Sequence, residues 1–186
     1  MILIPEAVWD RLLDEFARTV RGVERVGYID GVTLDGIGVA TTVTIPNAEL
    51  DTGYFDVCAE AMSQAGAHLR EHELTRLAQV HTHGFEGCLH SSRDDEMAYS
   101  QLEGALSIVL PFHAARRPAP HDGVVHLRGP DGWKPLATAA AAQTVRQIPS
   151  VLDYRSEEWI ESPIATKAPS MGFWRRLTRL VWRRSP

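Results

Sequence analysis

The chain has 186 residues and a net charge of −5, with 44% hydrophobic and 23% charged residues, a composition typical of a single globular domain. Residues 167–186 carry six basic side chains and no acidic one, whereas residues 1–166 carry 13 basic and 24 acidic ones. This acidic body disfavours direct binding to nucleic acid, and no apolar run reaches the roughly 18 residues of a membrane span. Two cysteines without paired spacing, Cys58 and Cys88, and the lack of a signal-like start predict a cytoplasmic protein.

The first third of the chain predicts a helix, a β-hairpin and a second helix. Apolar residues recur at helical spacing from Pro5 to Val20. The β-branched segment 37–45 follows a turn signal at Asp35-Gly36, so we expect it to pair with segment 25–29. Residues 54–70 again place apolar side chains three and four positions apart, which predicts the second helix.

The remaining segments alternate between strand-like and helix-like patterns. They predict strands at 77–80, 105–110, 123–127 and 133–136, and helices at about 94–102 and 137–148. This order favours an α/β fold in which helices flank a mixed sheet. We predict one domain over residues 1–150, a linker over 151–170 and a basic amphipathic tail over 171–186.

The segment from His81 to Asp94 combines side chains that suit a metal site. Two histidines two residues apart at a strand end point to the same side of the sheet. Neutral imidazole is a good ligand for Zn²⁺, and the Asp94 carboxylate would complete a His₂-carboxylate set. Three protein ligands leave one tetrahedral position for solvent, as in catalytic zinc sites. Ser91 or Ser92 is expected to cap the helix that carries Asp94.

Hydrolysis at such a site also requires an acid–base group and a hydrogen-bond donor. Glu24 precedes the first predicted hairpin strand in a Glu-x-x-Gly-x-x-x-Gly pattern formed with Gly27 and Gly31, and a carboxylate is a usual general base. The Ser91 hydroxyl could donate a hydrogen bond to the oxyanion of a tetrahedral intermediate.

The pattern His-x-His-x₇-Ser-x-x-Asp, with an upstream glutamate, resembles the signature of the JAMM (JAB/MPN-type) zinc metalloproteases. The resemblance covers about residues 5–150. It implies an MPN fold and hydrolysis of a peptide or isopeptide bond at the C-terminal tail of ubiquitin or a ubiquitin-like protein. It also implies that His81, His83 and Asp94 bind zinc, that Glu24 is the general base and acid, and that Ser91 stabilises the oxyanion.

In its small size the chain is most similar to bacterial JAB proteins associated with ubiquitin-like conjugation. We therefore expect a ubiquitin-like substrate and contacts with activating or conjugating enzymes of the same pathway. Three other hypotheses stay open: a JAB hydrolase that acts on a sulfur-carrier protein, a non-catalytic MPN scaffold, and a nucleic-acid-associated protein that acts through its tail.

Each site residue also has a purely structural interpretation. A single histidine can be an ordinary strand residue, Glu24 a surface residue, Ser91 only a helix cap, and Asp94 or Asp95 only a first-turn acid.

The sequence does not fix a role for Cys88, the basic tail or the other histidines. Cys88 is expected to be a buried apolar residue or a thiolate that blocks the open metal position. The basic tail is expected to dock on protein or on an anionic membrane surface. The remaining histidines lack ligand-like spacing and are expected to be surface or core residues: His68, His72, His113, His121 and His126.

Overall fold

The computed structural model describes residues 1–155, so the predicted tail 171–186 and most of the predicted linker 151–170 lie outside the described residues. Residues Met1–Ser150 form one compact unit, which contains every candidate site residue. In the described part of the chain, no helix combines the length and the hydrophobicity needed to cross a membrane.

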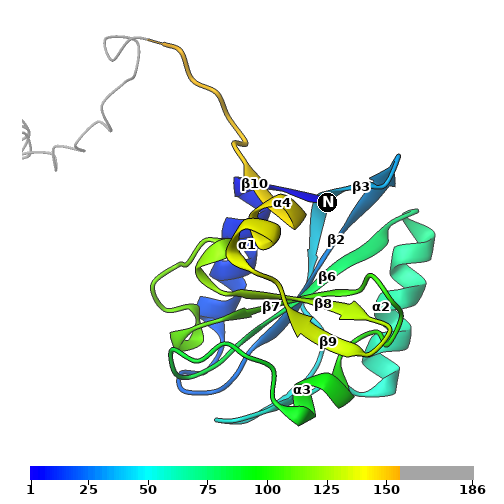
Figure 1. Cartoon of the computed structure of the whole chain (residues 1–186), viewed down its shortest axis with the longest axis vertical. Helices are drawn as coiled ribbons and strands as arrows, with labels where there is room; N and C mark the ends of the chain where they lie inside the picture. The colour runs from blue at the N-terminus through cyan, green and yellow to red at the C-terminus, as the bar shows by residue number, and fades with distance from the viewer. Residues whose placement is uncertain (156–186) are drawn as a thin grey trace, which may run out of the picture. The chain divides into compact units, whose positions relative to one another are not determined.

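A mixed sheet with the strand order β10-β1-β3-β2-β6-β7-β8-β9 organises this unit (Figure 1). Its strands are β1 (Ile2–Pro5), β2 (Val26–Leu34), β3 (Ile37–Thr44), β6 (Thr75–Thr82), β7 (Leu106–Leu110), β8 (Val124–Gly129), β9 (Gly132–Pro135) and β10 (Val145–Ile148). The β6–β7, β1–β3 and β1–β10 pairs are parallel, and the other pairs are antiparallel. Two short strands, β4 (Glu49–Leu50) and β5 (Phe55–Asp56), form a separate hairpin.

Four α-helices accompany the sheet in the described residues: α1 (Glu6–Arg18), α2 (Ala59–Glu71), α3 (Ser92–Met97) and α4 (Thr138–Thr144). Two short 3₁₀ segments, η1 (Phe112–Ala114) and η2 (Pro120–Asp122), lie between β7 and β8. The α/β class and the mixed sheet flanked by helices are thus confirmed.

The two long helices cover opposite faces of the sheet (Figure 1). The stripe of α1 is buried in the main core together with β-branched and leucine side chains of the sheet; it comprises Trp9, Leu12, Leu13 and Phe16. On the other face, a smaller cluster joins Val26, Tyr28 and Phe55 to Met62 of α2. Because side chains alternate along β2, this strand contributes to both clusters and fixes which residues face α2.

The β2–β3 hairpin follows the turn predicted at Asp35-Gly36, where the backbone φ angles are 50° and 77°. Such positive angles at both central residues are typical of the tight turns that connect hairpin strands. Strand β2 continues through Gly31 to Leu34, beyond the predicted end at residue 29. Gly31 lies at a register shift after Asp30, and a β-carbon at this position would overlap the backbone carbonyl of Val39.

Several predicted element boundaries differ from the structure. The helix expected over 137–148 ends at Thr144, because Val145–Ile148 pairs with β1 as strand β10. The helix expected over 54–70 begins only at Ala59, since Phe55 and Asp56 pair with β4. The helix expected to reach 102 ends at Met97. At Val145–Ile148, pairing with the distant strand β1 outweighs the local helical pattern.

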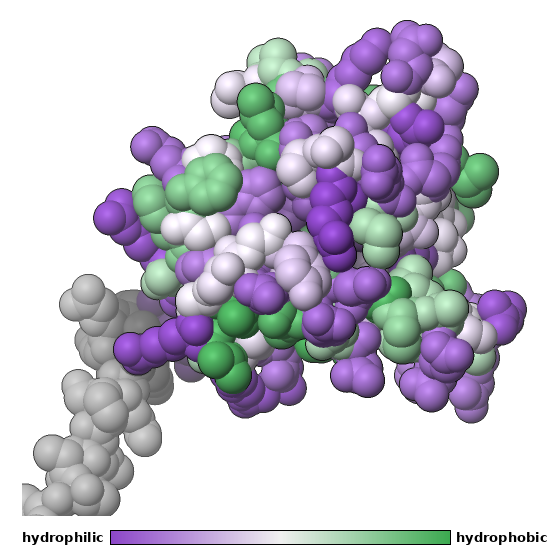
Figure 2. Space-filling model, turned by 90° about the horizontal axis from the view of Figure 1, so that it is seen from below, coloured by the Kyte–Doolittle hydropathy of each residue, from purple (hydrophilic) through white to green (hydrophobic). Residues whose placement is uncertain are grey.

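Figure 2 shows the molecule from the end at which α3 lies in Figure 1. The surface there is mainly hydrophilic, with separate hydrophobic patches. Exposed apolar residues at the loop after β6 and on α3 include Phe85, Leu89 and Met97.

Candidate metal centre

Strand β6, in the middle of the sheet, contains His81, and His83 is the first residue after its end at Thr82. His81 lies opposite Val26 of β2 and Val109 of β7 in the strand register. The Arg25 carbonyl accepts a hydrogen bond from the Thr82 backbone amide at 3.0 Å, and the His83 amide donates to the Leu110 carbonyl at 2.9 Å. Neighbouring strands on both sides therefore fix the backbone of the two histidines.

Helix α3 presents Asp94 to this strand end through a capping box. Ser91 is its N-cap, and the Ser91 hydroxyl accepts a hydrogen bond from the Asp94 amide at 3.2 Å. In return, Asp94 Oδ2 accepts hydrogen bonds from the Ser91 backbone amide at 2.7 Å and from the Ser91 hydroxyl at 2.8 Å. The cap thus sets the orientation of the carboxylate as well as the start of the helix.

The side chains of His81, His83 and Asp94 converge, and all three are buried. The Nε2 atom of His81 lies 3.5 Å from Asp94 Oδ1, and that of His83 lies 3.5 Å from Asp94 Oδ2. One ligand atom from each residue lies within 4.8 Å of the other two. This group could hold a metal ion, and the predicted ligand set is therefore brought together in space.

Hydrogen bonding in the cluster fits a metal with two imidazole ligands and one carboxylate. Neither ring nitrogen of His81 has a hydrogen-bond partner among the described residues, although both are buried. An unpaired buried acceptor is costly, and a bound cation would satisfy it. His83 Nδ1 lies 2.8 Å from the Gly87 carbonyl. Donation there requires the Nδ1–H tautomer and leaves Nε2 free as a ligand.

Two of the three candidate ligands, His81 and Asp94, are in the protonation state that metal binding requires. Burial lowers the pKa of His81 to about 3, so its imidazole is neutral near pH 7. Burial alone would raise the pKa of Asp94, but the neighbouring His83 and His81 imidazoles and the hydrogen bonds from Ser91 hold it below its usual value. A neutral imidazole and an ionised carboxylate bind a cation without first losing protons. Burial alone would lower the pKa of His83, but its hydrogen bonds to Asp94 and Gly87 and the nearby Glu24 carboxylate raise it above the usual value, so a metal would compete with a proton at this ring.

Glu24 lies two residues before the start of β2, which is the strand that neighbours β6. Its side chain is only 4% exposed, and its backbone amide donates to the Asp51 carbonyl at 2.7 Å. Burial raises the pKa of Glu24 to about 7; the His83 imidazole opposes the rise and the Asp94 carboxylate adds to it. Glu24 therefore interacts electrostatically with two of the three candidate ligands, and it can take up and release a proton near neutral pH.

Ser91 is solvent-exposed beside Asp94. In the structure its hydroxyl proton is directed to the Asp94 carboxylate. Donation to a substrate oxyanion would require this hydroxyl to rotate away from Asp94.

The loop between the ligands contains Cys88, for which the sequence predicted either a buried apolar residue or a thiolate that blocks the metal position. Cys88 is buried and its thiol donates to the Glu86 carbonyl at 3.3 Å. Burial, with the nearby Glu86 carboxylate, raises the pKa of Cys88. The neutral thiol is therefore favoured, which supports the structural interpretation of this cysteine over a blocking thiolate.

Sequence reasoning assigned no role to His90 and His126, which form a second layer behind the ligands. The His90 ring lies 2.8 Å from Asp95 Oδ1 through Nδ1 and 2.9 Å from the Ser107 hydroxyl through Nε2. It stacks on His126 with 3.9 Å between ring centroids. These contacts connect the loop to α3, β7 and β8. The position of His90 next to Ser91 was a signal in the sequence, but nothing local indicated His126.

A left-handed turn supports the loop on its other side. Three successive residues of η1, Phe112, His113 and Ala114, have φ angles of 51°, 53° and 57°, a conformation unfavourable for residues with a β-carbon. The His113 amide donates to the His83 carbonyl at 2.8 Å. A β-carbon on Gly84 would lie 2.9 Å from His113 Nε2. The turn therefore packs directly against the chain that leaves the second histidine.

Comparison with known proteins finds a solved structure with a similar fold but no matching sequence family. No family model matches the chain, and no curated protein matches it in sequence. The solution structure of protein DSY2949 from Desulfitobacterium hafniense matches with a TM-score of 0.62 and 15% identity, over 81% of this chain and 95% of that one. At this identity the likeness concerns the fold alone.

Proposed function

We propose that this protein is a zinc-dependent peptidase or isopeptidase of the JAMM type, with an MPN fold, that cleaves at the C-terminal tail of a ubiquitin-like protein. The observation that carries the proposal is the buried convergence of His81, His83 and Asp94 with an unpaired Nε2 on His81. The resemblance of the His-x-His-x₇-Ser-x-x-Asp pattern to the JAMM signature connects this metal site to hydrolysis.

His81, His83 and Asp94 would hold the metal. When bound there, zinc supplies Lewis acidity, which polarises a substrate carbonyl and acidifies water. The second layer formed by His90 and His126, together with the Ser91 cap, would keep the ligands in place, so that little reorganisation accompanies binding.

Glu24 would move the protons of the reaction. With a pKa of about 7, its carboxylate accepts a proton from attacking water and returns it to the departing amine, with similar ease in both directions. Ser91, after its hydroxyl turns from Asp94, would donate a hydrogen bond to the oxygen on which negative charge develops.

The surface around the site suits a protein substrate. Phe85 and Leu89, on the loop between the ligands, are 61% and 63% exposed, and Met97 on α3 is also exposed. Exposed apolar side chains at a functional site commonly contact a protein partner. A glycine-rich tail would fit beside them, since a residue without a β-carbon lets two backbones approach closely.

Cleavage of a fusion protein tests this proposal. The substrate is a ubiquitin-like protein from the same genome, extended after its C-terminal glycines by a short peptide. We expect zinc-loaded protein to release the peptide, chelation to stop the reaction, and added zinc to restore it. Asp94→Asn should abolish cleavage, whereas Glu96→Gln, at an exposed acidic position two residues further on α3, should retain it. A fully folded, zinc-loaded protein that binds the fusion without cleaving it would favour a scaffold and contradict the proposal.

A further inference from the structure

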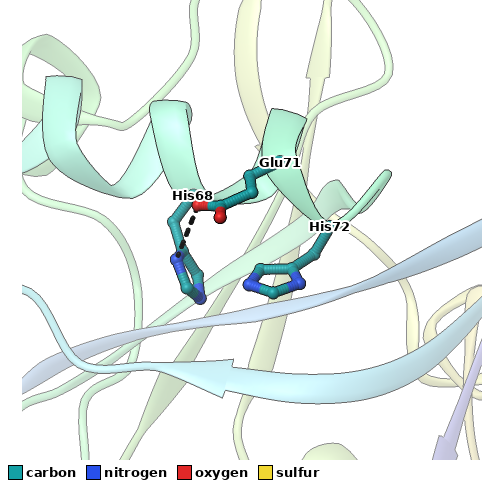
Figure 3. Close-up of side chains that lie close together, drawn as sticks. All are labelled: His68, Glu71 and His72. Carbon is teal, nitrogen blue, oxygen red and sulfur yellow. Dashed lines mark ion pairs between the residues drawn. The ribbon is translucent and has the colours of Figure 1, made fainter.

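A second group of potential metal ligands lies on the outer surface of α2. His68, Glu71 and His72 project from the C-terminal end of this helix (Figure 3). The ligand atoms of these three side chains lie within 4.8 Å of one another, and all three residues are exposed. None of them belongs to the cluster around His81, and the proposed hydrolysis does not use them.

The helix itself brings the two histidines together. The His72 amide donates to the His68 carbonyl at 3.1 Å, so the two residues are one helical turn apart. Residues at this spacing lie on the same helix face, and two histidines so placed can bind one zinc ion. The two rings are already in contact, with 4.2 Å between their centroids. Contrary to the expectation from the sequence, His68 and His72 therefore do have ligand-like spacing.

Glu71 adds an anionic ligand to the same face. Its Oε2 lies 3.9 Å from His68 Nδ1 (Figure 3). This separation is long for a hydrogen bond but leaves room for a cation between the two atoms. The partial negative charge at the end of a helix further favours a cation near its last turn.

From this geometry we infer that His68, Glu71 and His72 form a second, surface site for a borderline divalent cation of the zinc class. Imidazole ligands favour zinc, copper and nickel over magnesium and calcium, whose ligands are mainly oxygen atoms. The side chains of His68 and Glu71 are 64% and 74% exposed, so water retains access to the ion. This site therefore binds zinc more weakly than the buried cluster and exchanges it more readily.

Zinc titration of the full-length protein, followed by the histidine ring resonances in NMR, tests the inference. We expect the ring signals of His68 and His72 to shift together on addition of zinc, and equilibrium dialysis to show one zinc equivalent that His72→Ala removes. Glu71→Gln should weaken that equivalent without abolishing it. His121→Ala, an exposed histidine elsewhere on the surface, serves as the matched control and should bind zinc as the wild type does.

The outcome does not depend on the buried cluster. In Asp94→Asn, the surface equivalent should remain even though the buried site is lost. If the buried cluster binds no zinc, the wild type should show only the equivalent that His72→Ala removes. Equal zinc stoichiometry in the wild type and His72→Ala, or unshifted His68 and His72 resonances at millimolar zinc, would overturn the inference. Because Glu71, His72 and His121 are exposed, circular dichroism of their variants should show unchanged folding.

Discussion

Glu24 is an ionisable residue that is buried in the folded protein. Its folded-state pKa is about 7, against an ordinary value of 4.5. Below pH 4.5 the carboxyl is neutral in both the folded and the unfolded state, so ionisation does not affect stability. Between pH 4.5 and 7 the unfolded state ionises this carboxyl while the folded state keeps it protonated, so stability falls across this window and is constant above it. This difference in ionisation costs up to about 3 kcal/mol of stability.

Glu24→Gln removes this cost while keeping the size of the side chain. We predict that the metal-free variant is more stable than the metal-free wild type at pH 8, and that the difference shrinks as the pH falls towards 4.5. Thermal unfolding in the presence of a chelator measures it. A difference that is absent, or that grows at low pH, would show that Glu24 is not the buried group described here.

Ser91 acts on both the helix start and the Asp94 carboxylate. Ser91→Ala should therefore cost about 1 kcal/mol of stability through the lost cap and weaken zinc retention at the buried cluster by roughly 10- to 100-fold. Competition with a chromogenic chelator measures the affinity. Ser92→Ala, at the next, exposed position, is the control and should change neither quantity much. Equal zinc affinity in both variants would separate the cap from the metal site.

At this scale, the sequence was most informative where the chemistry is local. His81 and His83 lie at the end of one strand and just after it, and Ser91 and Asp94 form one capping box, so the spacing along the chain predicted how each pair is arranged. His126 illustrates the opposite case. His126 contacts His90 only because β8 pairs with β7. No sequence pattern near His126 predicts that pairing.

At the scale of elements, the β2–β3 hairpin positions Glu24 and β6, and it depends on Gly31. A β-carbon at Gly31 would overlap the Val39 backbone, which cannot move without disturbing the sheet. We predict that Gly31→Ala lowers the free energy of unfolding by more than about 3 kcal/mol. Gly53→Ala is the control, since nothing lies within 4 Å of its added carbon. Urea unfolding of both variants measures the difference; similar stabilities would mean that the hairpin adjusts at the bulge.

The long helices and the hairpin were predictable because their patterns repeat over many residues. Strands β1 and β10 were not, since each has only four residues and they pair across almost the whole unit. The helical pattern that begins in the alanine-rich segment continues in the sequence beyond Thr144, where α4 ends. The parallel pairing with β1, rather than local propensity, therefore determines where α4 ends.

At the scale of the whole molecule, the sequence divides into an acidic body and a basic tail, and all candidate ligands lie in the body. Met1–Ser150 is a compact unit with its own core. We predict that a chain ending at Arg155 keeps the buried zinc and any chelator-sensitive cleavage of the fusion protein at the wild-type level. Zinc analysis and the cleavage assay, compared with the full-length chain, test this. Loss of zinc on truncation would show that the tail contributes to the metal site.

The most direct test of the central claim is a zinc-edge anomalous difference map from crystals of the zinc-loaded, full-length protein. The account predicts a peak between His81 Nε2, His83 Nε2 and the Asp94 carboxylate, with zinc–nitrogen distances of about 2.0–2.1 Å, that disappears below the edge. Well-ordered side chains of these three residues without a zinc peak between them, in crystals grown with excess zinc, would contradict it.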